Sequence, residues 1–364
     1  MAHRRKECIS LFMTTRCNLK CTYCYLERYI QGSQSISLEF AKQGIRDFFS
    51  SSQIRHVRFY GVGEPALEFE KIKAIREFAF GLGGGDLKTE IQTNGVFSTD
   101  VTLWLADNID IIWISDDGPP DIQDTQRPLR EGGKSSEVIE RNIATLLDRG
   151  TKATVGARST ITPTNLYRQV EMIEYFHRLG IKAIFSDPVF PRVETNLANV
   201  KSLNVGEDFM MKYAREFLQA RRRAEELGIF YGSIFIVNFD EKTEYFCRSC
   251  LPCPHLTTDG YVSCCDLAFF GHILPELIYG KYDGHKGIID YDHEKIAAIR
   301  SRKASNLTEC QSCEVLYFCA GACFGEGVNE TGRLLGVKKT YCEAIRFLAK
   351  HMPLDAGLYP FLHP

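Results

Sequence analysis

The stretch Cys17-Asn18-Leu19-Lys20-Cys21-Thr22-Tyr23-Cys24 contains three closely spaced cysteines near the start of the sequence. It has the spacing C-x3-C-x2-C and follows the apolar run 8–13, which is typical of a buried strand. The thiols are therefore expected in a loop beyond a strand's carboxyl end, where sites of α/β proteins lie. Closed zinc sites and fully protein-ligated cubane clusters normally take four protein ligands, so three thiolates leave one position open. A zinc knuckle and a chance cluster of cysteines are the alternatives.

Composition limits the class of protein. The chain has 364 residues, 44% hydrophobic and 25% charged, which suits a large α/β domain with a smaller second one. A net charge of -2 gives no electrostatic reason to expect nucleic acid or an anionic membrane as partner. No window reaches the roughly 18 apolar residues of a membrane helix, and the apolar run after Lys6 is too short for a secretory signal. We therefore expect a cytoplasmic protein.

The fourteen cysteines are unevenly distributed. Four precede residue 25, ten follow residue 246, and none lies between. Because disulfides are rare in the cytoplasm, this number of cysteines indicates metal or iron–sulfur ligation. Cys8 is interpreted separately, as a small buried strand residue.

Apolar β-rich runs alternate with helical patterns over the first half of the chain. The expected strands are 9–13, 57–60, 89–92, 109–114, 153–157 and 181–185, and the expected helices are 38–50, 70–80, 100–107, 136–149, 166–179 and 206–227. This alternation predicts βαβ units and a parallel sheet that curves toward a barrel. Ser37 and Ser135 are expected N-caps, Gly150 and Gly180 are expected to end helices, and 188–204 is expected to be irregular.

The character of the sequence changes near residue 238. A last apolar run, 230–237, leads out of the predicted barrel, and short segments rich in cysteine and glycine follow. We place the first domain at residues 1–237 and the second at 238–364. The second contains the spacing C-x2-C-x5-C-x3-C, formed by Cys310, Cys313, Cys319 and Cys323, with Cys342 further on. A zinc ribbon is the alternative interpretation of these cysteines.

Glycine and polar residues follow four of the expected strands. They are Gly61-Val62-Gly63-Glu64-Pro65, Gln92-Thr93-Asn94-Gly95, Ser115-Asp116-Asp117-Gly118-Pro119 and Arg158-Ser159-Thr160-Ile161-Thr162. The glycines allow a ligand to approach the backbone, the Glu64 carboxylate suits an ammonium group, and the Arg158 guanidinium suits a carboxylate. Ordinary turn chemistry, and for Arg158 a surface salt bridge, are the alternatives.

Together these features resemble the radical S-adenosylmethionine (radical SAM) enzymes. The cysteine spacing, with Tyr23 just before the last cysteine, resembles their cluster loop, whose three cysteines hold a 4Fe–4S cluster that SAM chelates at the fourth iron. The resemblance implies that Cys17, Cys21 and Cys24 are the cluster ligands. It further implies a partial (β/α)6 barrel of the TIM type and a 5′-deoxyadenosyl radical that abstracts hydrogen from a substrate.

The polar segments resemble the SAM-binding motifs of the sulfatase-maturing and peptide-modifying members. Residues 61–65 resemble the G-G-E-P motif, with Val62 in place of a glycine, and the others resemble Q-T-N-G, S-x-D-G-P and R-x-T-x-T. Asp117 and Arg127 match positions nearer the substrate, and Gln123-Asp124 stands where many peptide maturases have His-Asp. The cofactor-binding residues inferred from these segments are Tyr23, Gly61, Val62, Gly63, Glu64, Gln92, Asn94, Ser115, Asp117 and Arg158.

The second domain is similar to the SPASM extension of these enzymes, C-x(9–15)-G-x4-C followed by C-x2-C-x5-C-x3-C and a final cysteine. The resemblance implies two auxiliary 4Fe–4S clusters. Cluster I would take Cys247, Cys253, Cys265 and Cys323, and cluster II would take Cys310, Cys313, Cys319 and Cys342. Cys250 can replace either of its neighbours and Cys264 can replace Cys265. If one early cysteine is not a ligand, cluster I has an open iron able to bind substrate.

Asp266 is the candidate catalytic residue. It follows Cys265, at a position proposed in the sulfatase-maturing enzymes to take a proton as the substrate radical is oxidised. A carboxylate in a dry cavity beside a cluster is expected to have a raised pKa, as a general base requires. A hydrogen bond to a nearby amide and plain exposure to solvent are the alternatives.

The expected protein is therefore a SAM-dependent enzyme with three 4Fe–4S clusters, reduced by a flavodoxin- or ferredoxin-type donor. Its first expected activity is oxidation or crosslinking of a peptide or protein side chain. One alternative is a dehydrogenase or epimerase of a small metabolite such as an aminoglycoside precursor. Another is a non-catalytic iron–sulfur or zinc scaffold, which would need no SAM pocket.

Overall fold

One continuous sheet organises the computed structural model, which describes residues 7–30, 32–190 and 206–354. The strand order is β11-β10-β9-β8-β1-β2-β3-β4-β5-β6-β7. The strands are β1 (Ile9–Phe12), β2 (His56–Tyr60), β3 (Lys88–Thr93), β4 (Ile111–Ser115), β5 (Thr154–Ile161), β6 (Ala183–Pro188), β7 (Phe230–Gly232), β8 (His255–Leu256), β9 (Tyr261–Ser263), β10 (Ile278–Asp283) and β11 (Ile288–Tyr291).

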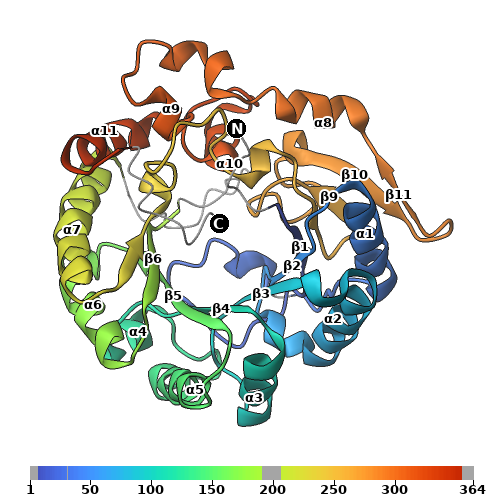
Figure 1. The fold of residues 1–364 in the computed structure, drawn as a ribbon, viewed down its shortest axis with the longest axis horizontal. Helices are drawn as coiled ribbons and strands as arrows, with labels where there is room; N and C mark the ends of the chain where they lie inside the picture. The colour runs from blue at the N-terminus through green and yellow to red at the C-terminus, as the bar shows by residue number, and fades with distance from the viewer. Residues whose placement is uncertain (1–6, 31, 191–205, 355–364) are drawn as a thin grey trace.

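Strands β1 to β7 are parallel and form the barrel part of the sheet. Helices cover its outer face in a ring (Figure 1). They are α1 (Leu38–Ser51), α2 (Phe69–Gly83), α3 (Thr99–Asn108), α4 (Pro120–Gln126), α5 (Ser136–Asp148), α6 (Gln169–Arg178) and α7 (Glu207–Glu226). The predicted α/β partial barrel is confirmed, with β7 and the short α4 as elements that the sequence patterns did not predict.

The helix ends follow local chemistry. Ser37 caps α1, since its hydroxyl accepts a hydrogen bond from the Phe40 amide, and Gly150 and Gly180 end helices with φ of +63° and +83°. Ser135 stands at the N-cap position of α5, as predicted, but its side chain makes no capping hydrogen bond. Its hydroxyl instead donates to the Arg127 carbonyl oxygen (2.7 Å), inside the loop before α5. The predicted irregular segment 188–204 lies outside the described residues from 191 onward.

The second half of the chain extends the same sheet. β8 pairs in parallel with β1, with Ser10 opposite His255, and β9, β10 and β11 add antiparallel strands. The helices here are α8 (His293–Arg300), α9 (Leu316–Cys319), α10 (Phe324–Thr331) and α11 (Cys342–His351). In Figure 1 these orange and red elements span the open side of the ring, from α1 to α7. Within the described residues, no helix combines the length and apolar character that crossing a membrane requires.

Candidate active site and cofactor sites

The three cysteines of the first loop lie directly beyond β1, at the carboxyl end of the parallel strands. Burial raises the pKa of Cys17 and Cys21 to about 12 and that of Cys24 to about 11. Iron binds the thiolate, so loading a cluster here would release protons. A loop that holds three partly buried thiols, each close enough to another to influence its pKa, fits the predicted cluster.

Arg130 fixes this loop from a distant part of the chain. Its Nε donates to the Cys17 carbonyl oxygen and its Nη2 to the Leu19 carbonyl oxygen, both at 3.0 Å. Its guanidinium also pairs with Glu27 at 3.1 Å. No local pattern indicates this role, because Arg130 lies in a loop more than a hundred residues away along the chain.

The glycine segment after β2 packs against the cysteine loop. The Gly63 amide donates to the Thr14 carbonyl oxygen (2.9 Å), and the Glu64 amide donates to the Arg16 carbonyl oxygen (2.7 Å). A Cβ at Gly63 would lie 1.9 Å from that Arg16 oxygen, so a side chain is excluded there. Val62 points into the core, with 4% of its surface exposed. Close backbone approach therefore explains the glycine at position 63.

Gly63→Ala is expected to destabilise the protein by about 1–3 kcal/mol, because the new methyl group forces the two loops apart. Gly81→Ala is the matched control. Gly81 lies in α2 with nothing within 4 Å of an added Cβ, so alanine should stabilise by about 0.5–1 kcal/mol. Anaerobic denaturant unfolding measures both changes, and equilibrium dialysis measures SAM binding. Equal stability of the two variants would contradict the packing argument.

Glu64 joins the glycine segment to the end of β3. Its carboxylate accepts hydrogen bonds from the Thr93 hydroxyl (2.6 Å), the Asn94 amide (2.6 Å) and the Ala66 amide (2.9 Å). Burial raises its pKa from 4.5 to about 7, against the effect of these donors. The Asn94 side chain in turn donates to Asn18 Oδ1 (2.7 Å) in the cysteine loop. Glu64 therefore organises the ends of β2 and β3, and it does so through bonds within the chain.

The raised pKa of Glu64 predicts a pH dependence of stability. Between about pH 4.5 and about pH 7 the folded protein keeps a proton that the unfolded chain releases, so this contribution to stability is lost as the pH rises. Glu64→Gln cannot ionise and should flatten that part of the profile. The measurement is the thermal unfolding midpoint of both proteins from about pH 5 to about pH 8. Parallel profiles would refute the assignment.

Asp117, in the loop after β4, binds several surrounding groups through its carboxylate. Its fully buried carboxylate accepts hydrogen bonds from the Tyr23 hydroxyl (2.8 Å), the Gln126 side chain (2.9 Å) and the Thr160 amide (2.8 Å), and it pairs with Arg127 at 3.0 Å. The Arg127 guanidinium lies over the Tyr23 ring. The structure thus joins the cysteine loop to the ends of β4 and β5 through Tyr23 and Asp117.

Arg158, within β5, lies opposite Ser115 at the end of β4 in the sheet register. Its guanidinium pairs with the partly buried Asp187 carboxylate at 3.2 Å and lies over the Phe185 ring. Burial raises the pKa of Asp187, and the Arg158 charge opposes that rise. The surface salt bridge considered for Arg158 is therefore replaced by a largely buried ion pair with β6.

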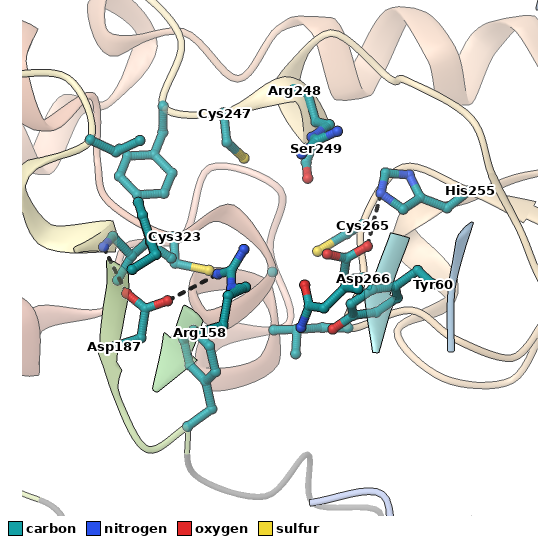
Figure 2. A pocket seen from close by; sticks show the side chains of 18 of the residues that line it. Tyr60, Arg158, Asp187, Cys247, Arg248, Ser249, His255, Cys265, Asp266 and Cys323 are labelled. Carbon is teal, nitrogen blue, oxygen red and sulfur yellow. Dashed lines mark hydrogen bonds and ion pairs between the residues drawn. The ribbon is translucent and has the colours of Figure 1, made fainter. Parts of the chain in front are cut away.

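A cavity of about 140 Å³ lies between the barrel mouth and the cysteine-rich segments (Figure 2). Gln92 and Arg158 line its barrel side, together with Tyr25, which follows Cys24. Cys247, Cys265 and Cys323 line the other side, and Figure 2 shows these thiols around the same space. The cavity thus brings predicted SAM contacts from the barrel together with three of the predicted ligands of cluster I.

Asp266 lines this cavity in a fixed ion pair. Its carboxylate lies 3.0 Å from Arg58 Nη1 and 3.1 Å from His255 Nε2, with 34% of the side chain exposed. Burial would raise its pKa, but the Arg58 charge and the His255 hydrogen bond outweigh burial and hold the pKa well below its ordinary value. The predicted raised pKa is therefore wrong. The cause was not visible in the sequence, because Arg58 and His255 approach only when β8 pairs with β1.

A second, smaller cavity collects four other thiols. It is lined by Cys310, Cys313, Cys319 and Cys342, the set predicted for cluster II. No three His, Cys, Asp or Glu side chains in the described part of the chain converge as they would around a single metal ion. A cubane cluster is several atoms across, so its ligands surround a space instead. The four thiols around one cavity fit such a group.

The other three cysteines of the second half of the chain are not among the residues that line either cavity. Cys250 is fully buried, and its thiol contacts that of Cys247. Cys253 is buried beside Cys8, at the amino ends of β8 and β1. Cys264 is buried next to Cys265. The structure therefore brings three of the four predicted ligands of cluster I together around its cavity, and Cys253 is not among the lining residues.

Residues 11–176 match the family described as the radical SAM superfamily. The chain is 24% identical over 341 residues to the serine-type anaerobic sulfatase-maturating enzyme of Bacteroides thetaiotaomicron, covering 84% of this chain and 80% of that protein. It is also 24% identical over 188 residues to the tungsten-containing aldehyde ferredoxin oxidoreductase cofactor-modifying protein of Pyrococcus furiosus. That match covers 50% of this chain and 51% of the relative.

Two solved structures share the fold over nearly the whole chain. Native anSMEcpe with bound AdoMet (SAM) superposes with a TM-score of 0.72 at 18% identity, covering 94% of this chain and 96% of that one. Streptococcus suis SuiB bound to the precursor peptide SuiA gives a TM-score of 0.68 at 16% identity, covering 93% and 76%. The fold described above is therefore shared with both proteins, across the barrel and the cysteine-rich segments.

Proposed function

Because the chain carries a radical SAM domain and is an enzyme of that superfamily, we propose that it abstracts hydrogen from a side chain of a peptide or protein. The cavity between Tyr25 and Cys265 carries this proposal, since it is lined both by the residue that follows the last cysteine of the first loop and by three of the auxiliary thiols. A relative named as a sulfatase-maturating enzyme and the SuiB complex with its precursor peptide support a peptide substrate.

Three sets of residues have separate roles in this proposal. When bound, SAM and the cluster supply a carbon-centred radical able to take a hydrogen atom. Cys17, Cys21 and Cys24 are the ligands of that cluster, and Arg158 and Gln92 are the residues facing SAM from the cavity. Asp266 is a fixed anionic acceptor that orients a substrate donor group, because its lowered pKa makes it a weak base.

We propose three 4Fe–4S clusters in all. The four thiols of the second cavity hold cluster II, and Cys247, Cys265 and Cys323 hold cluster I with a fourth ligand from Cys253 or Cys250. Cys250→Ala and Cys253→Ala distinguish these two, because only a true ligand alters the spectrum of cluster I on removal. If neither alters it, the fourth iron is open to the cavity. A flavodoxin or ferredoxin donor and a cytoplasmic location, where thiols stay reduced, suit this chemistry.

The test is anaerobic reconstitution followed by reaction with SAM, a reductant and a panel of peptides that contain Ser or Cys. The expected results are about twelve irons per chain, 5′-deoxyadenosine, and a peptide product that has lost two hydrogens or gained a crosslink. A Gly/Ala peptide is the matched control. Formation of 5′-deoxyadenosine with a change only in a small polyol or aminosugar would favour the metabolite dehydrogenase instead. Tight zinc and no iron would defeat both.

A further inference from the structure

Arg302 is a buried cation without an anionic partner in the part of the chain that the structure describes. It lies two residues beyond α8 and has 1% of its surface exposed. Nη2 donates to the Gly321 carbonyl oxygen at 3.1 Å, while Nε and Nη1 have no hydrogen-bond partner. The guanidinium lies over the Phe324 ring, 5.1 Å from its centroid.

Such an arrangement is unfavourable unless negative charge lies nearby. Burying an isolated ion costs several kcal/mol, and unsatisfied N–H groups add to that cost. The carbonyl that accepts from Arg302 belongs to a glycine with φ of +79°, where a Cβ would lie 2.3 Å from Leu307 Cδ1 and 3.1 Å from Nη2.

The surroundings of Arg302 belong to both auxiliary sites. Gly321 lines the cavity of cluster II, and Phe324 follows Cys323, which lines the cavity of cluster I. Contact with Cys247 and burial raise the pKa of Cys250, burial raises that of Cys310, and the charge of Arg302 opposes both rises. Arg302 thus lies between the two groups of thiols.

We propose that Arg302 is the positive charge shared by the two auxiliary clusters, and that cluster and thiolate sulfur satisfy its unpartnered N–H groups. This inference rests on the proposed three-cluster function. A reduced cluster is more negative by one charge than an oxidised one, so a buried cation beside it favours the reduced state. Arg302 would therefore raise the reduction potential of the auxiliary clusters. It would act through its charge and its hydrogen bonds, without contacting the substrate.

The experiment compares Arg302→Met, Arg302→Lys and the matched control Arg300→Met in the reconstituted full chain. Arg300 is exposed at the end of α8. Midpoint potentials come from anaerobic redox titration followed by electron paramagnetic resonance. For Arg302→Met we expect the reduced-to-oxidised ratio of an auxiliary cluster to fall at least tenfold at fixed potential, a shift of about 59 mV to lower potential. Arg302→Lys should restore most of it, and the SAM-sensitive signal should not move.

Each outcome decides the proposal. A shift in Arg302→Met that Arg302→Lys reverses supports it, as does loss of auxiliary iron in the methionine variant alone. Unchanged potentials in both variants, or equal loss of iron from both, overturn it and leave a structural role. Iron counting on the wild type separates the two levels of inference. About four irons per chain defeat the three-cluster proposal and Arg302 with it, whereas about twelve irons with unshifted potentials defeat Arg302 alone.

Discussion

Replacing Cys17, Cys21 and Cys24 together by alanine is expected to reduce 5′-deoxyadenosine formation to the rate of a protein-free reaction. The three thiols lie in the one loop that joins β1, the glycine segment after β2 and the loop after β4. Without them no iron remains for SAM to chelate, and loss of a cofactor site removes its chemistry altogether. Iron content should fall from about twelve to about eight per chain, because the auxiliary thiols lie around other cavities.

Thr22→Ala is the matched control for this triple substitution. Thr22 lies within the same loop but is exposed, so its replacement should leave both iron content and SAM cleavage near wild type. Substantial SAM cleavage by the triple variant would show that the radical originates elsewhere. Complete loss of iron from it would show that the auxiliary sites depend on the first loop.

Asp117→Asn is expected to destabilise the folded protein by about 3–5 kcal/mol, because it leaves the Arg127 charge buried without a counter-charge. Asparagine keeps the size of the side chain but has one acceptor oxygen, whereas Asp117 accepts from three donors and pairs with Arg127. The Tyr23 hydroxyl would lose its anchor, so SAM binding should weaken as well. Denaturant unfolding and equilibrium dialysis measure the two effects.

Asp107→Asn provides the comparison. Asp107 pairs with Arg149 at 2.7 Å, but 51% and 44% of these side chains are exposed. Water therefore already solvates both charges, and the substitution should change stability far less. Similar losses in the two variants would mean that the Asp117–Arg127 pair is not isolated from solvent as the structure has it.

Local sequence patterns predict the barrel strands and helices. Short elements and side-chain contacts between distant segments are not predicted by such patterns. Apolar runs of parallel strands and amphipathic helices repeat within short windows, so β1 to β6 were visible in the sequence. β7 has three residues and α4 has seven, which is too short for a period to appear. Ser135 stands before a helix, yet its hydroxyl bonds to the Arg127 carbonyl oxygen, a contact that local rules do not include.

The site divides in the same way. The spacing of the cysteines predicted the thiols that share the cluster II cavity. Roles that depend on distant partners were not predictable: Arg130 binds the cysteine loop across more than a hundred residues, and Arg58 lowers the pKa of Asp266 across more than two hundred. The position of Asp266 beside a cluster ligand follows from its neighbour Cys265 in the sequence. The charged groups that set its pKa are brought to it only by the fold.

The pairing of β8 with β1 has a consequence for how the chain reaches this fold. Strand β1 has one hydrogen-bonding edge whose partner, His255–Leu256, is synthesised more than two hundred residues after β1 itself. Until then that edge is a template for pairing with other chains, which is a route to aggregation during expression. Fragments that end at residue 237 would keep the hazard permanently, so the barrel and the cysteine-rich segments are best produced as one polypeptide.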